Sequence, residues 1–250
     1  MPPVALHTIF EALAYAIGFR TFLWTRARLA PDAFRHHDHV VWVAVGAVVG
    51  AALGAKLAYW LDDPLNAFAD FPDIRHLLEG KSIIGALLGG LCGVELAKKI
   101  ARVDNSTGDA FVLPLTLGMC IGRIGCFLAG LGDHTYGLAT SLPWGVDFGD
   151  GVPRHPTQLY EIVFLLAQYA LLHRRRDAFA RPGDRFRAFM LGYLLFRLLV
   201  EFIKPVFHLY PGDLSGLQWL CVAGLVYYAP AIPRILRALF TRGCRAWKPG

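Results

Sequence analysis

Seven apolar stretches constrain the fold of this 250-residue chain more than any other feature. A transmembrane helix needs about 20 mostly apolar residues. The chain is 55% hydrophobic and 18% charged, whereas soluble domains carry about 25% charged residues. We therefore expect an all-α polytopic membrane protein with about seven transmembrane helices. The expected spans are 5–24, 40–61, 82–97, 109–129, 158–173, 186–204 and 216–236.

Basic residues alternate along the chain in a way that fits seven spans. Seventeen lysines and arginines lie in the segments that follow the first, third, fifth and seventh spans, and four lie in the alternate segments, which are rich in aspartate. Cytoplasmic loops collect Lys and Arg, so the pattern predicts an N-terminus outside and a cytoplasmic C-terminus. The net charge of +6 then serves topology and contact with anionic membrane lipid, not with nucleic acid.

The chain shows no linker, low-complexity tract or internal repeat, so residues 1–250 are predicted to form one membrane-embedded domain. Its longest extracytoplasmic loop spans about 130–157. No basic segment precedes the first span, which is therefore expected to act as an uncleaved insertion signal. The five cysteines lack metal-ligand spacing, and neither a metal site nor a cofactor is expected.

Two arginines stand near the middle of apolar stretches, where a charge costs a few kcal/mol and is rarely without function. Arg123 lies in the fourth stretch, and Arg197 lies in the sixth, one helical turn before Glu201 and one turn after Tyr193. A planar guanidinium binds phosphate bidentately, so both arginines are predicted to bind a lipid phosphate. The alternatives are an Arg197–Glu201 pair within one helix and a packing role for Arg123.

Three segments carry distinctive patterns: Gly122-Arg-Ile-Gly-Cys-Phe-Leu-Ala-Gly130, Arg154-His-Pro-Thr-Gln-Leu-Tyr-Glu161 and Gly192-Tyr-Leu-Leu-Phe-Arg-Leu-Leu-Val-Glu-Phe202. In this order they resemble the prolipoprotein diacylglyceryl transferase family. The resemblance implies a seven-span protein of the bacterial cytoplasmic (inner) membrane. It also implies a reaction in which phosphatidylglycerol donates its diacylglyceryl group to the lipobox cysteine of a prolipoprotein signal peptide, forming a thioether and releasing glycerol phosphate.

The same motifs suggest which side chains contact the substrates. Hydroxyl, amide and carboxylate groups near the two arginines are expected to bind the donor's glycerol or to orient the guanidinium groups. The predicted substrate-binding residues are Arg123, Arg197, Glu201, Tyr193, His155, Gln158, Tyr160, Glu161 and Glu11.

The chain also departs from the family pattern. Cys126 and Ala129 stand where the family has asparagines, and residues 80–90 lack a histidine that family members carry near the third span. Cys126 is interpreted as a small apolar residue, with a covalent role as the alternative. These departures leave open a different acceptor or transferred moiety. A lipid or anion transporter is the second alternative, although the paired repeats typical of transporters are missing.

The missing histidine leaves three candidates for the group that removes the acceptor's proton: His134, His155 and Glu11. His134 is the preferred general base, positioned by its neighbour Asp133, because both lie in the loop where a lipobox cysteine would arrive. His155 precedes a proline at a predicted helix start and could be structural. Glu11 could instead pair with Lys56 or Arg123.

Overall fold

Helices dominate the structure, a computed structural model that describes residues 3–29, 37–69 and 80–240. The long helices are α1 (Pro3–Leu29), α2 (His37–Asp62), α5 (Ile83–Ala101), α6 (Val112–Ala129), α7 (Thr157–Arg174), α8 (Asp184–Val200) and α9 (Gly216–Tyr228). The shorter ones are α3 (Pro64–Ala67) and α10 (Ile232–Phe240), with 3-10 turns η1 (Gly108–Phe111), η2 (Gly130–Asp133), η3 (Arg176–Ala178), η4 (Glu201–Ile203) and η5 (Ala229–Ala231).

Each of the seven predicted apolar stretches is helical, which confirms the expected all-α character. The last is interrupted at η5, where Pro230 removes a backbone donor and the chain continues as α10. Within the described residues, three segments are both long and apolar enough to cross a membrane: His39–Asp62, Gly108–Asp133 and Gly216–Phe240. Some charges used for the orientation lie outside the described residues, namely Arg35, Arg75, Arg242, Arg245 and Lys248.

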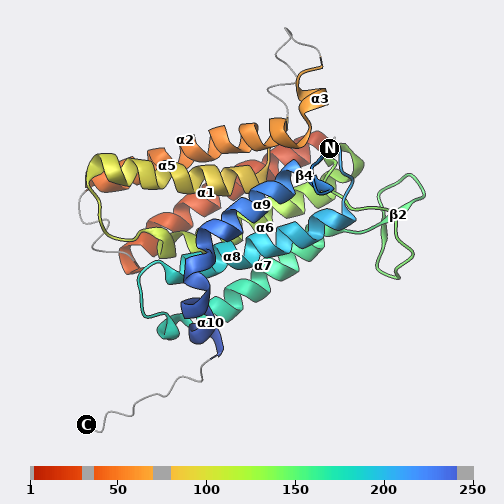
Figure 1. The fold of residues 1–250 in the computed structure, drawn as a ribbon. Coiled ribbons are helices and arrows are strands. Elements are labelled where there is room, and N and C mark those ends of the chain that lie inside the picture. Colours follow the sequence, from red (N-terminus) through yellow and green to blue (C-terminus); the bar gives the residue numbers. More distant parts are fainter. Residues whose placement is uncertain (1–2, 30–36, 70–79, 241–250) are drawn as a thin grey trace.

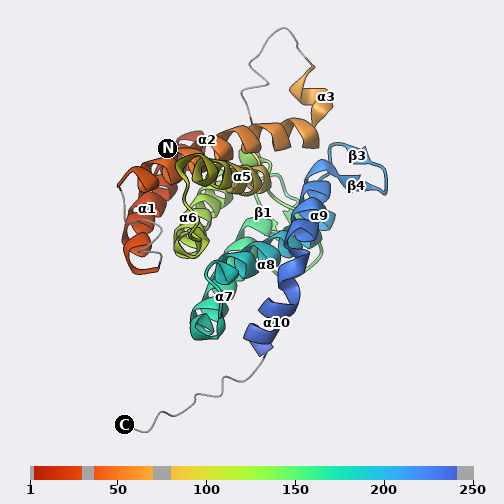
Figure 2. The same ribbon diagram turned by 60° about the vertical axis from the view of Figure 1, so that its left-hand side comes forward.

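The long helices lie side by side, with α2 and α5 along one side of the bundle and α7 and α8 along the other (Figures 1 and 2). Helices α2 and α5 touch through glycines. A Cβ on Gly50 would lie 2.3 Å from the carbonyl oxygen of Gly89, and one on Gly54 would lie 2.2 Å from that of Gly85. The small-residue stripe of α2 therefore permits the close backbone approach seen between membrane helices.

Helices α6, α7, α8 and α9 enclose the main core. Phe189, Tyr193 and Leu194 of α8 are completely buried, and Phe164 stacks on Phe196 with ring centroids 4.3 Å apart. Helix α9 begins at a capping box, in which Ser215 and Gln218 satisfy each other's backbone N–H groups. Tight packing on all sides fixes the rotamers of the polar side chains that α8 carries toward α7.

The segment between α6 and α7 forms a structured loop at the end of the bundle where the N-terminus of the chain lies (Figure 1). It contains the antiparallel strands β1 (Val146–Asp147) and β2 (Pro153–Arg154), and a second pair, β3 (Leu209–Tyr210) and β4 (Leu214–Ser215), precedes α9. The end of α6, the start of α7 and the end of α8 meet beneath the first pair.

Candidate active site

A buried ion-pair network joins three helices at this end of the bundle. Glu161 of α7 accepts from Arg197 Nη1 of α8 at 3.0 Å and from the Tyr193 hydroxyl at 2.8 Å, and its carboxylate forms an ion pair with Arg123 Nε of α6 at 2.9 Å. Arg197 Nη2 also donates to Glu201, at 2.9 Å. Glu161 is 1% exposed and Arg197 is 3% exposed. The charges are compensated, as a buried network requires.

The two arginines differ in how many of their terminal nitrogens remain available to a ligand. Arg197 gives both terminal nitrogens to carboxylates, so its predicted pair with Glu201 is present and a second one, with Glu161, is added. In the described part of the chain, the terminal nitrogens of Arg123 hydrogen-bond only Cys126 Sγ, at 3.9 Å. Arg123 is therefore the arginine with donors to offer a ligand.

Two further charged residues face this network and were missed from the sequence. The ammonium of Lys204 interacts electrostatically with Arg197, Glu201, Arg123 and Glu161. Asp62, at the end of α2, interacts with Glu201 and accepts from the backbone N–H of Leu217. Both lie at the edge of apolar stretches, where a charge resembles an ordinary helix end and gives no separate signal.

The start of α7 is held by its neighbours in the loop. His155 Nδ1 lies 3.1 Å from the Tyr160 hydroxyl, which also accepts from Trp144 Nε1 at 2.8 Å. The backbone of His155 pairs with Gly137 and Leu138. A Cβ on Gly137 would lie 2.6 Å from that of His155, so glycine is required for this contact. His155 thus has the structural setting that was the alternative to a catalytic role.

Two hydrogen bonds link α7 to Asp133 in the loop, and Asp133 in turn lies against α1. Gln158 Nε2 donates to Thr135 Oγ1 at 3.1 Å, and Thr135 Oγ1 donates to Asp133 Oδ2 at 2.5 Å. The other oxygen of Asp133 lies 3.1 Å from His7 Nδ1. The loop carboxylate therefore faces the first helix.

The contact between Asp133 and His7 corrects the predicted pairing of Asp133 with His134. His134 adopts a left-handed backbone with a φ of 53°, and its exposed side chain lies beside Tyr136, with ring centroids 6.4 Å apart. The histidine that Asp133 contacts is His7, which the sequence analysis did not select.

Glu11 binds neither of the partners suggested for it from the sequence. Its carboxylate accepts from Lys81 Nζ and from the Tyr15 hydroxyl at 2.9 Å, and lies 4.0 Å from His7 Nε2. Lys56 instead donates to the carbonyl of Gly80 at 2.8 Å. Glu11 thus belongs to the surroundings of His7.

Cys126 contacts both the Glu161 network, through Arg123, and the residues around His7. Its Sγ is close to Arg123, and it also forms a cluster with His7 and Asp133 in which the three candidate ligand atoms lie within 4.8 Å of one another. Because these residues are 119 and 7 positions apart along the chain, no sequence spacing reveals the cluster.

The tip of the loop is stabilised by a separate, exposed ion pair. Arg154 donates to both carboxylate oxygens of Asp150, each at 2.7 Å, and so holds the pKa of Asp150 below its usual value. The carboxylate of Asp147 accepts from three consecutive backbone N–H groups at positions 149–151. The loop therefore has a defined shape above the buried network.

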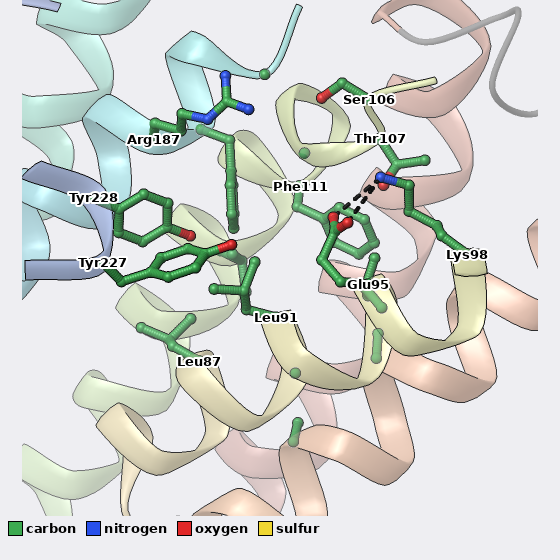
Figure 3. Close-up of a pocket in the computed structure, with 18 of the residues that line it drawn as sticks. Leu87, Leu91, Glu95, Lys98, Ser106, Thr107, Phe111, Arg187, Tyr227 and Tyr228 are labelled. Atoms are coloured by element: carbon green, nitrogen blue, oxygen red, sulfur yellow. Dashed lines mark hydrogen bonds and ion pairs between the residues drawn. The ribbon is translucent and has the colours of Figure 1, made fainter. Parts of the chain in front are cut away.

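A cavity of about 330 Å³ lies at the other end of the bundle (Figure 3). Its walls carry the Glu95–Lys98 ion pair, Arg187 and the hydroxyls of Tyr227 and Tyr228 among apolar side chains. Arg187 and Arg197 are ten residues apart on α8, a rise of about 15 Å. The cavity is therefore separate from the Glu161 network.

Comparison with known proteins gives one family. The chain matches the prolipoprotein diacylglyceryl transferase family over residues 3–232. It is 33% identical over 240 residues to a phosphatidylglycerol–prolipoprotein diacylglyceryl transferase of Bordetella parapertussis, covering 88% of this chain and 87% of the relative. A protein of the same name from Geobacter sulfurreducens is 36% identical over 179 residues, covering 67% of this chain and 64% of the relative. The chain belongs to the prolipoprotein diacylglyceryl transferase family.

Proposed function

We propose that this protein transfers the diacylglyceryl group of phosphatidylglycerol to the lipobox cysteine of a prolipoprotein signal peptide, in the inner membrane of a bacterium. The observation that carries the proposal is the convergence of Arg123 and Arg197, from separate helices, on the buried Glu161. The names of the relatives supply the donor and acceptor. Residues 1–250 act as one membrane-embedded domain, with the loop at 130–157 on the extracytoplasmic side.

Arg123 is the direct phosphate contact in this proposal. Its terminal nitrogens are not held by a carboxylate, whereas its Nε is fixed by Glu161. Arg197 and Tyr193 hold Glu161 in place, so they position Arg123 through that carboxylate. A charge-assisted contact of this kind, prepared before the substrate arrives, stabilises charge without reorganisation during the reaction.

The bond changes follow from this placement. The acceptor sulfur, as a thiolate, attacks the glycerol carbon that carries the phosphate. A C–S bond forms, the C–O bond breaks, and the phosphate oxygen keeps the electron pair. The departing glycerol phosphate has one more negative charge than the phosphodiester had, and Arg123 faces that developing charge.

A labelled-lipid assay tests the proposal. Purified protein is incubated with phosphatidylglycerol that carries separate labels in its acyl chains and its headgroup glycerol, together with a lipobox peptide. We expect acyl label on the cysteine peptide and headgroup label in free glycerol phosphate. A peptide with serine in place of cysteine is the matched control and should stay unlabelled. Acyl label on another acceptor, or no headgroup release, contradicts the proposal.

A further inference from the structure

The cluster of His7, Cys126 and Asp133 joins an imidazole, a thiol and a carboxylate at one point between α1, α6 and η2. These are the three kinds of ligand that Zn²⁺ takes, at bond lengths of about 2.0–2.3 Å. Ligand atoms of a tetrahedral zinc site therefore lie about 3.3–3.8 Å apart. In the structure all three atoms lie within 4.8 Å of one another, so small side-chain movements bring them to bonding distance.

One ring nitrogen of His7 is left available to a ligand. Its Nδ1 is buried and makes no hydrogen bond within the described residues, although Asp133 Oδ1 lies 3.1 Å away. A nitrogen this close to a carboxylate oxygen, yet not aligned with it, has its lone-pair axis directed elsewhere. Both atoms can then bind a third atom placed between them and the sulfur of Cys126.

The surroundings supply the outer contacts that metal ligands use. The remaining ring nitrogen of His7, Nε2, faces Glu11 at 4.0 Å, and the second oxygen of Asp133 is held by Thr135 at 2.5 Å. A metal-bound histidine almost always directs its other nitrogen to a carboxylate or carbonyl. Arg123 Nη1 lies 3.9 Å from Cys126 Sγ and can donate to a thiolate there.

We propose that His7, Cys126 and Asp133 bind one Zn²⁺ ion, and that its open fourth position takes the acceptor cysteine as a thiolate. With a neutral imidazole, the thiolate of Cys126 and the carboxylate of Asp133, the site is electrically neutral before the acceptor binds. A third of the His7 side chain is exposed, which leaves a side open for the acceptor. This inference rests on the proposed function and supplies the nucleophile for it.

The metal removes the need for a general base in the position where the family carries its histidine. A thiol that coordinates Zn²⁺ loses its proton outright, and here the proton passes to solvent at the loop. The bound sulfur then attacks the donor carbon, the C–S bond forms, and glycerol phosphate leaves with the C–O electron pair. The guanidinium of Arg123, beside Cys126, places the phosphate next to the metal-bound sulfur.

Metal content is the first test. Full-length protein, purified in detergent without chelator and desalted, is analysed for zinc by mass spectrometry. We expect about one zinc per chain, falling at least tenfold in His7→Ala, Cys126→Ser and Asp133→Asn. Cys92→Ser, which changes an exposed cysteine of α5, is the matched control and should keep its zinc. Zinc-free wild-type protein that also fails to take up added zinc overturns the proposal, as does unchanged zinc in folded Cys126→Ser.

Affinity gives a second reading that does not depend on removing a ligand. Glu11→Gln leaves all three ligands in place and removes the negative charge that faces His7 Nε2, together with the ion pair to Lys81. Loss of an outer partner typically lowers metal affinity about 10–100-fold, and competition with a chromophoric chelator measures it. If zinc affinity is the same in Glu11→Gln and wild type, the assigned coordination through Nδ1 is wrong.

Cobalt spectroscopy tests the fourth position. In protein reloaded with Co²⁺, the thiolate-to-cobalt absorption band reports bound sulfur, and Cys126 alone should give the starting band. A cysteine lipobox peptide should increase the band to about twice its intensity, whereas the serine peptide should leave it unchanged. No increase with the cysteine peptide overturns the acceptor role.

The two proposals fail separately in these measurements. Label transfer from phosphatidylglycerol by metal-free wild-type protein contradicts the zinc site and supports the transferase function. If zinc is bound and the cobalt band depends on the cysteine peptide, but no label is transferred, the transferase function is contradicted and the zinc site is supported.

Discussion

Two neighbouring polar clusters in this protein are built in different ways. The Glu161 network is almost completely buried, and each of its charges has a partner of opposite charge. The cluster of His7, Cys126 and Asp133 is partly open, and the Nδ1 of His7 makes no hydrogen bond within the described residues. Arg123 belongs to the first and touches the second through Cys126. The comparison indicates that the buried network holds its own side chains in fixed positions. The open cluster, in contrast, leaves room for the ligand proposed above.

The largest expected effect tests whether Glu161 is the centre of the buried network. Glu161→Ala leaves Arg123 and Arg197 without that carboxylate, and breaking a buried ion pair costs about 3–5 kcal/mol. We expect little folded protein and no label transfer. Glu201→Ala is the matched control, since it removes one partner of Arg197 only. Recovery of monodisperse protein after heating in detergent compares the two, and equal losses would show that Glu161 has no special position.

The second prediction separates His7 from His134. His7→Ala should lower the rate of transfer about 10²–10⁴-fold, the range for losing assistance with proton removal, because the proposed zinc ion that deprotonates the acceptor thiol loses a ligand. The deficit should shrink as pH rises past about 8.5, where the acceptor thiol ionises unaided. His134→Ala should change the rate at most about twofold, because the exposed His134 is not oriented by Asp133. A large loss in His134→Ala with normal His7→Ala would reverse the assignment.

A smaller effect tests how the arginine fork is used. Arg197→Lys keeps the charge, but an ammonium cannot hold Glu161 and Glu201 in one plane. Loss of one charge-assisted hydrogen bond, about 1.5–3 kcal/mol, should lower kcat/KM for phosphatidylglycerol about 10–150-fold. Arg234→Lys, in the Asp184 ion pair at the opposite end of α8, is the matched control and should behave as wild type. If both variants turn over normally, Arg197 does not position Arg123.

The two clusters also differ in how far the sequence could predict them. Arg197, Tyr193 and Glu201 lie at four-residue spacing on one helix, so helical periodicity alone places them together. Charge inside an apolar stretch marks Arg123 as a functional residue. The seven helices follow from hydropathy in the same way, except for the break at Pro230.

The other cluster depends on tertiary contacts that sequence patterns do not contain. His7 reaches Asp133 only because α1 packs along α6 and η2 turns the loop back over the end of α1. His134 is adjacent to Asp133 in the chain, but its exposed side chain lies beside Tyr136. The three proposed ligands lie too far apart along the chain to form a recognisable sequence motif.

An exposed ion pair provides the smallest effect and a contrast with the buried network. Arg154 and Asp150 lie as close as the buried pairs, at 2.7 Å, but on the loop surface, where such pairs contribute little. Asp150→Asn keeps an oxygen for the backbone N–H of Val152 and should change the rate of transfer less than about twofold.

The sign of its pH dependence follows from the carboxylate. Arg154 holds the pKa of folded Asp150 below the unfolded value of about 3.9, so the stabilisation is complete above that pH and is lost as pH falls through the folded pKa. Melting temperatures of wild type and Asp150→Asn should therefore differ slightly at pH 7 and converge in stronger acid. A difference that grows on acidification would mean that the aspartate stabilises the loop in its protonated form. A loss comparable with that of Glu161→Ala would mean that closeness, and not burial, sets the strength of an ion pair here.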